Sequence, residues 1–196
     1  GFDLKHSLWS ARLLMESPQA IVDAHLAYLR AGAGCIMTAS YQASVPGFMS
    51  LGISHDEAQK LIALSVQLAR EAVDQFCREN SPRERPLIAA SVGPYGAYLA
   101  DGSEYRGDYR ADANALRDFH QPRMKLLLEA NPDILACETV PCLTEAQVLS
   151  DLIMEFAAPA WISFSCRDGQ RLSSGESISE AASVLKYNPY LFALGV

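Results

Sequence analysis

The chain has 196 residues, which is long enough to bury one hydrophobic core, so we expect a single domain over residues 1–196. Apolar residues make up 49% and charged residues 20% of the chain, an ordinary balance for a globular protein. The formal net charge is -7 and no run of Lys or Arg is present, which argues against nucleic acid as a partner. No apolar run approaches the roughly 20 residues that a membrane helix needs, so we also expect no membrane partner.

The five cysteines are an odd number, which does not fit a disulfide framework. Cys35, Cys137 and Cys166 lie in short apolar runs, and Cys77 lies in a segment with helical periodicity. This pattern predicts buried, reduced thiols, and it favours a cytoplasmic protein.

Helical and strand-like segments alternate along the chain. Capping signals and apolar periodicity predict helices that begin at Ser17, Ser54, Asp112, Thr144 and Ser177. Short apolar runs predict strands at residues 35–39, 87–92, 134–138, 161–166 and 190–196. Residues 40–54 are predicted to be a loop, because they contain Pro46, Gly47 and Gly52.

Strands that are apolar throughout, alternating with helices, are typical of a parallel sheet that is buried on both faces. An open doubly wound sheet and a TIM barrel both satisfy this order. Polar residues stand at successive strand ends, where a TIM barrel carries its site. They are Thr38, Ser40, Ser91, Glu138, Thr139, Ser163 and Ser165. We therefore predict an α/β TIM barrel, incomplete here because five strands are evident and a barrel has eight.

Residues 93–109, which we call the tyrosine loop, follow the strand at 87–92 and contain Gly, four tyrosines and three carboxylates. Long loops without secondary structure of their own are usually functional or disordered, and aromatic residues argue against disorder. We expect the loop to form one wall of a binding site. Its acidic side chains and aromatic rings suit a cationic ligand, and a self-packed loop with a solvated acidic rim is the alternative. These side chains are Tyr95, Tyr98, Tyr105, Tyr109, Asp101, Glu104 and Asp108.

Glu138 ends an apolar strand, where a carboxylate must be solvated, paired or bound to a ligand. A salt bridge or a contact with a helix N-terminus is the structural alternative to ligand binding. Thr38 and Ser40 could bind the carboxylate or amine of a small ligand, or they could satisfy the backbone of a turn.

Neither cysteine nor histidine predicts a metal site. Cys137 and Cys142 have a spacing that does not exclude zinc, but no histidine lies near them and a packing role fits better. The histidines lie on predicted helices or their caps, away from strand ends, and none is a convincing base or ligand. They are His6, His25, His55 and His120.

Several motifs, in order along the whole chain, resemble the homocysteine S-methyltransferase family, and most closely the branch that uses S-methylmethionine. These motifs begin at Leu8 (Leu-Trp-Ser-Ala), Thr38 (Thr-Ala-Ser-Tyr-Gln), Ser91 (Ser-Val-Gly-Pro-Tyr-Gly-Ala-Tyr), Asp101 (Asp-Gly-Ser-Glu-Tyr) and Cys137 (Cys-Glu-Thr). The resemblance implies a TIM barrel that transfers a methyl group from a sulfonium donor to homocysteine, giving methionine. It also implies a zinc ion on three cysteine thiolates that binds the homocysteine sulfur.

The resemblance implies substrate-binding roles for six residues. Glu138 would hold the amino group of homocysteine, and Thr38 and Ser40 would line the amino-acid pocket. Tyr41 and Thr139 belong to the same two motifs and are assigned to the pocket with them. We assign Tyr95 to the methyl donor, together with the acidic side chains of its loop, because rings and carboxylates attract a cation.

The sequence also departs from the family pattern. The zinc cysteines of the family lie after the strand that ends at Val196 in this chain, and the first strand of the family also has no counterpart in residues 1–196. We therefore expect zinc in the full-length protein, no metal bound to this chain, and no catalytic residue within residues 1–196. Two other hypotheses stay open. One is a TIM-barrel glycoside hydrolase with Glu138 as its acid, and the other is a non-catalytic fragment that binds an amino acid.

Overall fold

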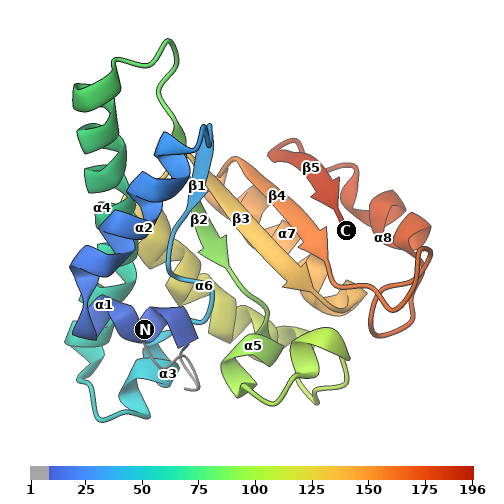
Figure 1. Cartoon of the computed structure of the whole chain (residues 1–196). Coiled ribbons are helices and arrows are strands. Elements are labelled where there is room, and N and C mark those ends of the chain that lie inside the picture. The colour runs from blue at the N-terminus through green and yellow to red at the C-terminus, as the bar shows by residue number, and fades with distance from the viewer. Residues whose placement is uncertain (1–8) are drawn as a thin grey trace. The chain divides into compact units, whose positions relative to one another are not determined.

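The structure is a computed structural model that describes residues 9–196, so the predictions for His6 and for the start of the Leu8 motif lie outside the described residues. The elements, in chain order, are η1 (Trp9–Arg12), α1 (Leu13–Glu16), α2 (Pro18–Arg30), β1 (Cys35–Met37), α3 (Val45–Met49), α4 (His55–Asn80), β2 (Leu87–Val92), α5 (Tyr95–Leu99), η2 (Ser103–Tyr105), α6 (Ala113–Glu129), β3 (Ile134–Val140), α7 (Leu143–Phe156), β4 (Ala160–Phe164), α8 (Ile178–Leu185) and β5 (Leu191–Gly195). Figure 1 shows their course. None of the helices within residues 9–196 is long and apolar enough to cross a membrane.

The chain forms two compact units. Unit 1 contains the described residues up to Ser91 together with Leu126–Ile134, and unit 2 contains Val92–Lys125 and Leu135–Val196. The expectation of a single domain over residues 1–196 stays a prediction.

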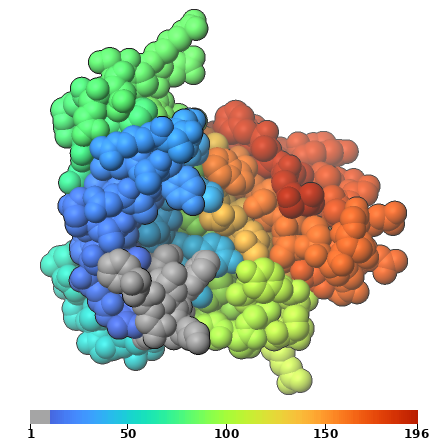
Figure 2. Space-filling model, viewed as in Figure 1, coloured from blue at the N-terminus to red at the C-terminus, as the bar shows by residue number. Residues whose placement is uncertain are grey.

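In unit 1 the strands β1 and β2 pair in parallel, with Ile36 opposite Ile88. Helices α2 and α4 pack against each other through the apolar stripes that their periodicity predicts. Near the ends of these helices Arg30 pairs with Glu79 at 2.8 Å, and in Figure 2 the blue atoms of α2 lie against the green atoms of the last turns of α4. The sequence thus predicted both helices of this layer.

The helix ends of unit 1 confirm one capping prediction and correct another. Ser54 caps α4, because its Oγ accepts a hydrogen bond from the Glu57 amide at 3.3 Å. Ser17 occupies the cap position of α2, but its side chain makes no capping hydrogen bond.

The prediction of a loop at residues 40–54 is wrong in part, because α3 forms there. The Ser44 hydroxyl accepts from the Gly47 amide at 3.2 Å, and Pro46 fits the first turn.

In unit 2 the strands β3, β4 and β5 lie side by side and run in the same direction (Figure 1). The inner residues of β3 and β4 are buried, as expected for strands covered on both faces. Strand β5 differs from this expectation, because none of its residues is buried and Phe192 is 71% exposed. Ser177 caps α8 by accepting from the Glu180 amide at 3.0 Å. Helix α7 begins one residue earlier than predicted, at Leu143, so Thr144 lies inside the helix and does not cap it.

The described strands confirm an α/β fold whose strand pairs β1–β2, β3–β4 and β4–β5 are parallel. The order of strands within each unit follows the chain, as expected when a helix crosses over between successive parallel strands. The predicted buried state of the thiols is wrong in part, because Cys35 is exposed and Cys77 and Cys166 are half-buried. In the three-residue strand β1, Cys35 and Met37 share one face and are exposed, whereas Ile36 between them is buried.

Candidate functional site

The hydroxyls predicted at the end of β1 come together in unit 1. The Oγ atoms of Thr38 and Ser40 are 2.6 Å apart and buried. Ser40 donates its hydroxyl hydrogen to the Ser91 carbonyl at 2.7 Å, so Thr38 is the donor in the bond between the two hydroxyls. Thr38 Oγ1 in turn accepts from the Ser91 amide at 3.0 Å. These bonds form a closed ring of neutral groups that ties the residues after β1 to β2. Tyr41 follows the ring and is half-buried.

Glu138 and Thr139 lie at an irregularity of β3 in unit 2. The prediction that Glu138 ends this strand is wrong, because β3 continues to Val140. Cys137 is opposite Ile162 and Val140 is opposite Phe164, so β3 carries one residue more than β4 in this interval. Such a β-bulge turns side chains away from the regular alternation and is common beside active sites.

Thr139 has a φ of +62°, in the left-handed region. A β-branched residue rarely adopts this conformation, and it costs on the order of 1–3 kcal/mol. Glu138 and Thr139 are both half-buried. The sequence identified these residues, but it gave no sign of the bulge or of the strained backbone.

The sequence predicted that the tyrosine loop has no secondary structure of its own. This prediction is wrong, because the loop contains α5 and η2. Three of its rings pack together and against Phe119 of α6, with centroids separated by 5.1 Å for Tyr95–Phe119, 5.2 Å for Tyr98–Phe119 and 5.5 Å for Tyr95–Tyr109. Tyr105, by contrast, is 66% exposed. The loop is therefore a folded, largely self-packed segment, and the role of Tyr95 in donor binding stays a prediction.

A guanidinium that the sequence interpretation did not consider lies among the carboxylates of the loop. Arg106 is 3.2 Å from Asp108 and 3.9 Å from Asp101. Hydrogen bonds from Ser103, with a smaller effect of Arg106, hold the pKa of Asp101 below its usual value. Glu104 has a different environment: it is half-buried, and its carbonyl oxygen accepts from the Ser165 hydroxyl at 2.7 Å.

Glu145, in the first turn of α7, is the buried carboxylate that sequence reasoning missed as a functional group. Its Oε1 accepts from the Tyr95 amide at 2.6 Å and lies 2.7 Å from His120 Nε2, and its Oε2 accepts from the Tyr109 hydroxyl. Since a carboxylate only accepts, His120 carries its hydrogen on Nε2. The sequence signal was present, because Glu145 stands in the first helical turn, but we interpreted it as part of a capping motif.

Burial determines the protonation of this network. Burial lowers the pKa of His120, and the Glu145 carboxylate opposes that change only in part. Burial, followed by the charge of Glu145, raises the pKa of Tyr109 far above its usual value. Tyr109 therefore keeps its hydrogen and remains a donor to Glu145. The prediction that His120 lies on a helix is confirmed, and its partner is a helical carboxylate rather than a strand-end group.

The cysteines of the described residues have no metal-site geometry. No group of three His, Cys, Asp or Glu side chains that could hold a metal ion occurs within residues 9–196. Burial raises the pKa of Cys137 to about 12 and also raises that of Cys142. Both changes oppose the thiolate form that a metal ligand needs.

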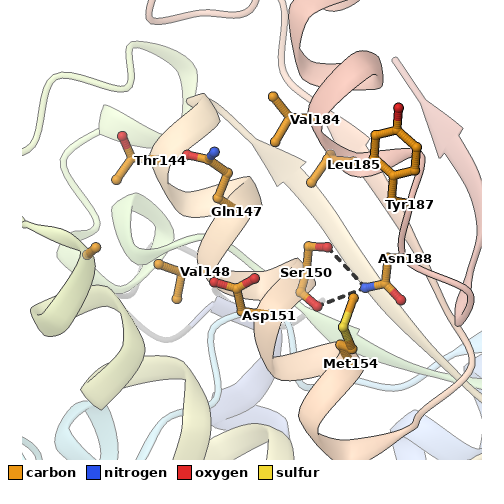
Figure 3. Close-up of a pocket in the computed structure, with 11 residues that line it drawn as sticks. Thr144, Gln147, Val148, Ser150, Asp151, Met154, Val184, Leu185, Tyr187 and Asn188 are labelled. Carbon is orange, nitrogen blue, oxygen red and sulfur yellow. Dashed lines mark hydrogen bonds between the residues drawn. The ribbon is translucent and has the colours of Figure 1, made fainter.

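A groove of about 360 Å³ lies between α7 and the end of α8 in unit 2 (Figure 3). Asn188 crosses one end of it and donates to the Ser150 carbonyl at 2.8 Å and to the Ser150 hydroxyl at 3.0 Å. None of the six predicted substrate-binding residues lines this groove. It is a helix–helix surface feature, and the strand-end groups remain the candidate site.

The family model for homocysteine S-methyltransferase matches residues 2–196. The chain belongs to the homocysteine S-methyltransferase family. It is 52% identical over 200 residues to homocysteine S-methyltransferase YbgG of Bacillus subtilis and 47% identical over 197 residues to homocysteine S-methyltransferase of Escherichia coli. Each alignment covers 100% of this chain and 64% of the relative, so the chain spans about 64% of the length of these members.

The fold also matches a solved member of the family. The metallated form of the homocysteine methyltransferase MmuM from Escherichia coli superimposes with a TM-score of 0.95 and 47% identity, covering 99% of this chain and 68% of that one. Its apo form gives a TM-score of 0.80 over 94% of this chain. Membership of the homocysteine S-methyltransferase family does not favour a glycoside hydrolase or a non-catalytic amino-acid-binding fragment.

Proposed function

We propose that the full-length protein transfers a methyl group from S-methylmethionine, or a related sulfonium donor, to homocysteine and so forms methionine. The observation that carries this proposal is the bulge at Glu138–Thr139, in a chain that belongs to the homocysteine S-methyltransferase family. Strained backbone persists only where the surrounding structure enforces it, and such sites cluster where ligands bind.

The proposed roles follow from charge and position. Glu138 holds the ammonium group of homocysteine, because a half-buried carboxylate gains most from a cationic partner. Thr38, Ser40 and Tyr41 line the pocket for the amino acid, and Thr139 lies next to Glu138 in the bulge. Tyr95 belongs to the donor side, supported by the ring cluster that fixes its position.

The thiol of homocysteine must lose its proton before it attacks the methyl carbon. A free thiol has a pKa of about 8.5, so little thiolate exists at neutral pH. Zinc supplies the thiolate when it is bound, because a metal deprotonates a coordinated thiol. The described residues do not fit a zinc site, since Cys137 and Cys142 have raised pKa values and no three-ligand group is present among them. We therefore propose zinc for the full-length protein alone and assign none of its ligands to these residues.

The proposal also includes the TIM-barrel fold and a cytoplasmic location. A TIM barrel is supported by the parallel strands and by the superposition on MmuM. A cytoplasmic location is supported by the five free cysteines, since thiols stay reduced in that compartment.

The test is methionine formation by the full-length protein from homocysteine and S-methylmethionine, measured by mass spectrometry. Glu138→Gln should raise the KM for homocysteine by at least about tenfold, because a charge-assisted hydrogen bond becomes a neutral one. Glu71→Gln, the same change at an exposed residue of α4, should leave KM unchanged. The absence of methionine formation by the wild type, or an unchanged KM in Glu138→Gln, would contradict the proposal.

A further inference from the structure

Both ends of the tyrosine loop are bound to one buried carboxylate. Glu145 is completely buried, and it accepts from the Tyr95 amide at the start of the loop and from the Tyr109 hydroxyl at its end. His120 of α6 lies 2.7 Å from the same carboxylate. A single side chain therefore closes the loop and attaches it to two helices.

The buried Arg123 side chain binds the start of the tyrosine loop as well, through a backbone carbonyl. Arg123 is 2% exposed and donates to the Gly93 carbonyl at 3.0 Å, while its guanidinium lies 5.2 Å from the Phe119 ring. The turn after Val92 thus has its carbonyl oxygen on Arg123 and its amide, two residues later, on Glu145. Hydrogen bonds to charged groups are stronger than neutral ones, so this turn is held firmly.

The middle of the loop is fixed by backbone packing. A Cβ atom at Gly96 would collide with the Glu104 amide nitrogen, so α5 and η2 are in direct backbone contact. The Ser165 hydroxyl, after β4, donates to the Glu104 carbonyl at 2.7 Å. Together with the ring cluster, these contacts leave the loop in one folded arrangement.

Stability alone does not account for this choice of residues. Buried charges pay a large desolvation cost, and apolar side chains of similar volume often give equal or greater stability. A buried charged network does, however, define geometry more narrowly than apolar packing. The segment that it holds continues directly from β2, and the carboxyl ends of parallel strands are where α/β proteins bind ligands. The held segment also carries three carboxylates against one guanidinium, that of Arg106, which favours a cationic ligand.

We propose that Glu145 is a positioning residue that holds the tyrosine loop in the conformation that receives the cationic methyl donor. This inference rests on the proposed function, because it needs a methyl donor to be recognised. Glu145 acts through Tyr95 and Tyr109 and does not touch the reacting atoms.

The test uses the full-length protein and separates the KM of the two substrates. Tyr109→Phe deletes one hydroxyl from the network and should raise the KM for S-methylmethionine about fivefold, with the KM for homocysteine changed less than about twofold. Tyr28→Phe makes the same change at an exposed ring of α2 and should alter neither value. Glu145→Leu should have a larger effect than Tyr109→Phe. Glu145→Gln should restore most of the donor affinity, because an amide can still accept from Tyr95 and donate to Tyr109.

Hydrogen exchange provides a readout that does not depend on activity. The amides of residues 93–109 should exchange faster in Tyr109→Phe than in the wild type, while Tyr28→Phe matches the wild type. Unchanged donor KM and unchanged exchange in Tyr109→Phe would overturn the inference, even if Glu145→Leu fails to fold. An equal rise in both KM values would also overturn it, because that result indicates general destabilisation. A wild-type protein without methyl transfer would overturn the proposed function and the donor assignment with it, while the exchange result would still show whether Glu145 holds the loop.

Discussion

In each unit, polar side chains bind a segment that follows a strand, but they are neutral in unit 1 and charged in unit 2. In unit 1, Thr38 and Ser40 use neutral hydroxyls to bind the Ser91 backbone. In unit 2, the buried charged groups Glu145 and Arg123 bind the turn that opens the tyrosine loop. Both arrangements satisfy buried polar groups, but the cost of losing one member differs greatly.

The difference follows from what is left behind when one group is removed. A missing hydroxyl leaves a neutral donor or acceptor without its partner, which costs about 1–3 kcal/mol. A missing Glu145 carboxylate leaves three donors without their acceptor, which costs about 1–3 kcal/mol for each donor. Removal of one group should therefore cost less stability in the ring of Thr38, Ser40 and Ser91 than in the network of Glu145.

The largest expected effect is on the charged network. Glu145→Leu should lower the free energy of unfolding by at least about 3 kcal/mol, because the Tyr95 amide, the His120 ring and the Tyr109 hydroxyl all lose their acceptor. Ser40→Ala should cost about 1–3 kcal/mol in the same measurement by urea denaturation. Glu155→Leu is the matched control on α7, since the Glu155 side chain is 41% exposed and its pair with Arg117 should contribute less than about 1 kcal/mol. Equal losses at Glu145 and Ser40 would remove the contrast between the two regions.

The buried side chains of His25 in unit 1 and His120 in unit 2 predict how the free energy of unfolding depends on pH. His120 has the Glu145 carboxylate as its partner, whereas His25 Nε2 in unit 1 is buried and has no hydrogen-bond partner among residues 9–196. Burial lowers the pKa of His25 from 6.5 to about 4. The unfolded chain therefore takes up a proton near pH 6.5 and the folded chain only near pH 4. The contribution of His25 to the free energy of unfolding is therefore fully present above pH 6.5. It falls by about 3 kcal/mol as the pH drops towards 4.

His25→Leu should flatten this part of the stability profile, which is measured as the unfolding free energy between pH 4 and pH 7. His55→Leu is the control, because the His55 side chain is 57% exposed at the start of α4. A profile for His25→Leu that keeps the wild-type slope would show that another group is responsible.

A third prediction concerns the close backbone contact within the tyrosine loop. Gly96→Ala should destabilise the protein by about 1–3 kcal/mol, because the added Cβ meets backbone atoms that cannot move aside. Gly34→Ala adds the same atom where no heavy atom of the described residues lies within 4 Å, and it should be close to neutral. Thermal unfolding distinguishes the two variants, and equal melting temperatures would show that the loop yields easily.

The smallest expected effect is at the strained position of β3. Thr139→Gly should keep or raise stability by up to about 1 kcal/mol, because glycine accepts a positive φ without cost. Thr144→Gly, inside α7, should lower stability by about 1 kcal/mol, as glycine does in a helix. Thr139→Gly should also raise the KM for homocysteine, because the bulge loses its rigidity. A loss of stability at Thr139 as large as that at Thr144 would mean that the positive φ stores no strain.

The sequence by itself determined the order and type of most elements. The capping Ser54 and Ser177, and the apolar runs that form β2 and β5, are local signals whose chemistry acts within a few residues. The same reasoning also selected Glu138 and Thr139, because a carboxylate at the end of an apolar strand demands a partner. Helix α3 was missed although Ser44 and Pro46 carried its signal.

Only the tertiary structure decided the other features. The bulge that holds Thr139 at a positive φ depends on the register between β3 and β4, which lies outside any local pattern. In the sequence, Glu145 is an ordinary carboxylate in the first turn of a helix. Its partners Tyr95, Tyr109 and His120 are distant in the sequence, and only the folded chain brings them to it. Periodicity and capping report interactions between near neighbours, whereas a buried network depends on which side chains burial brings together, and a single sequence does not carry that information.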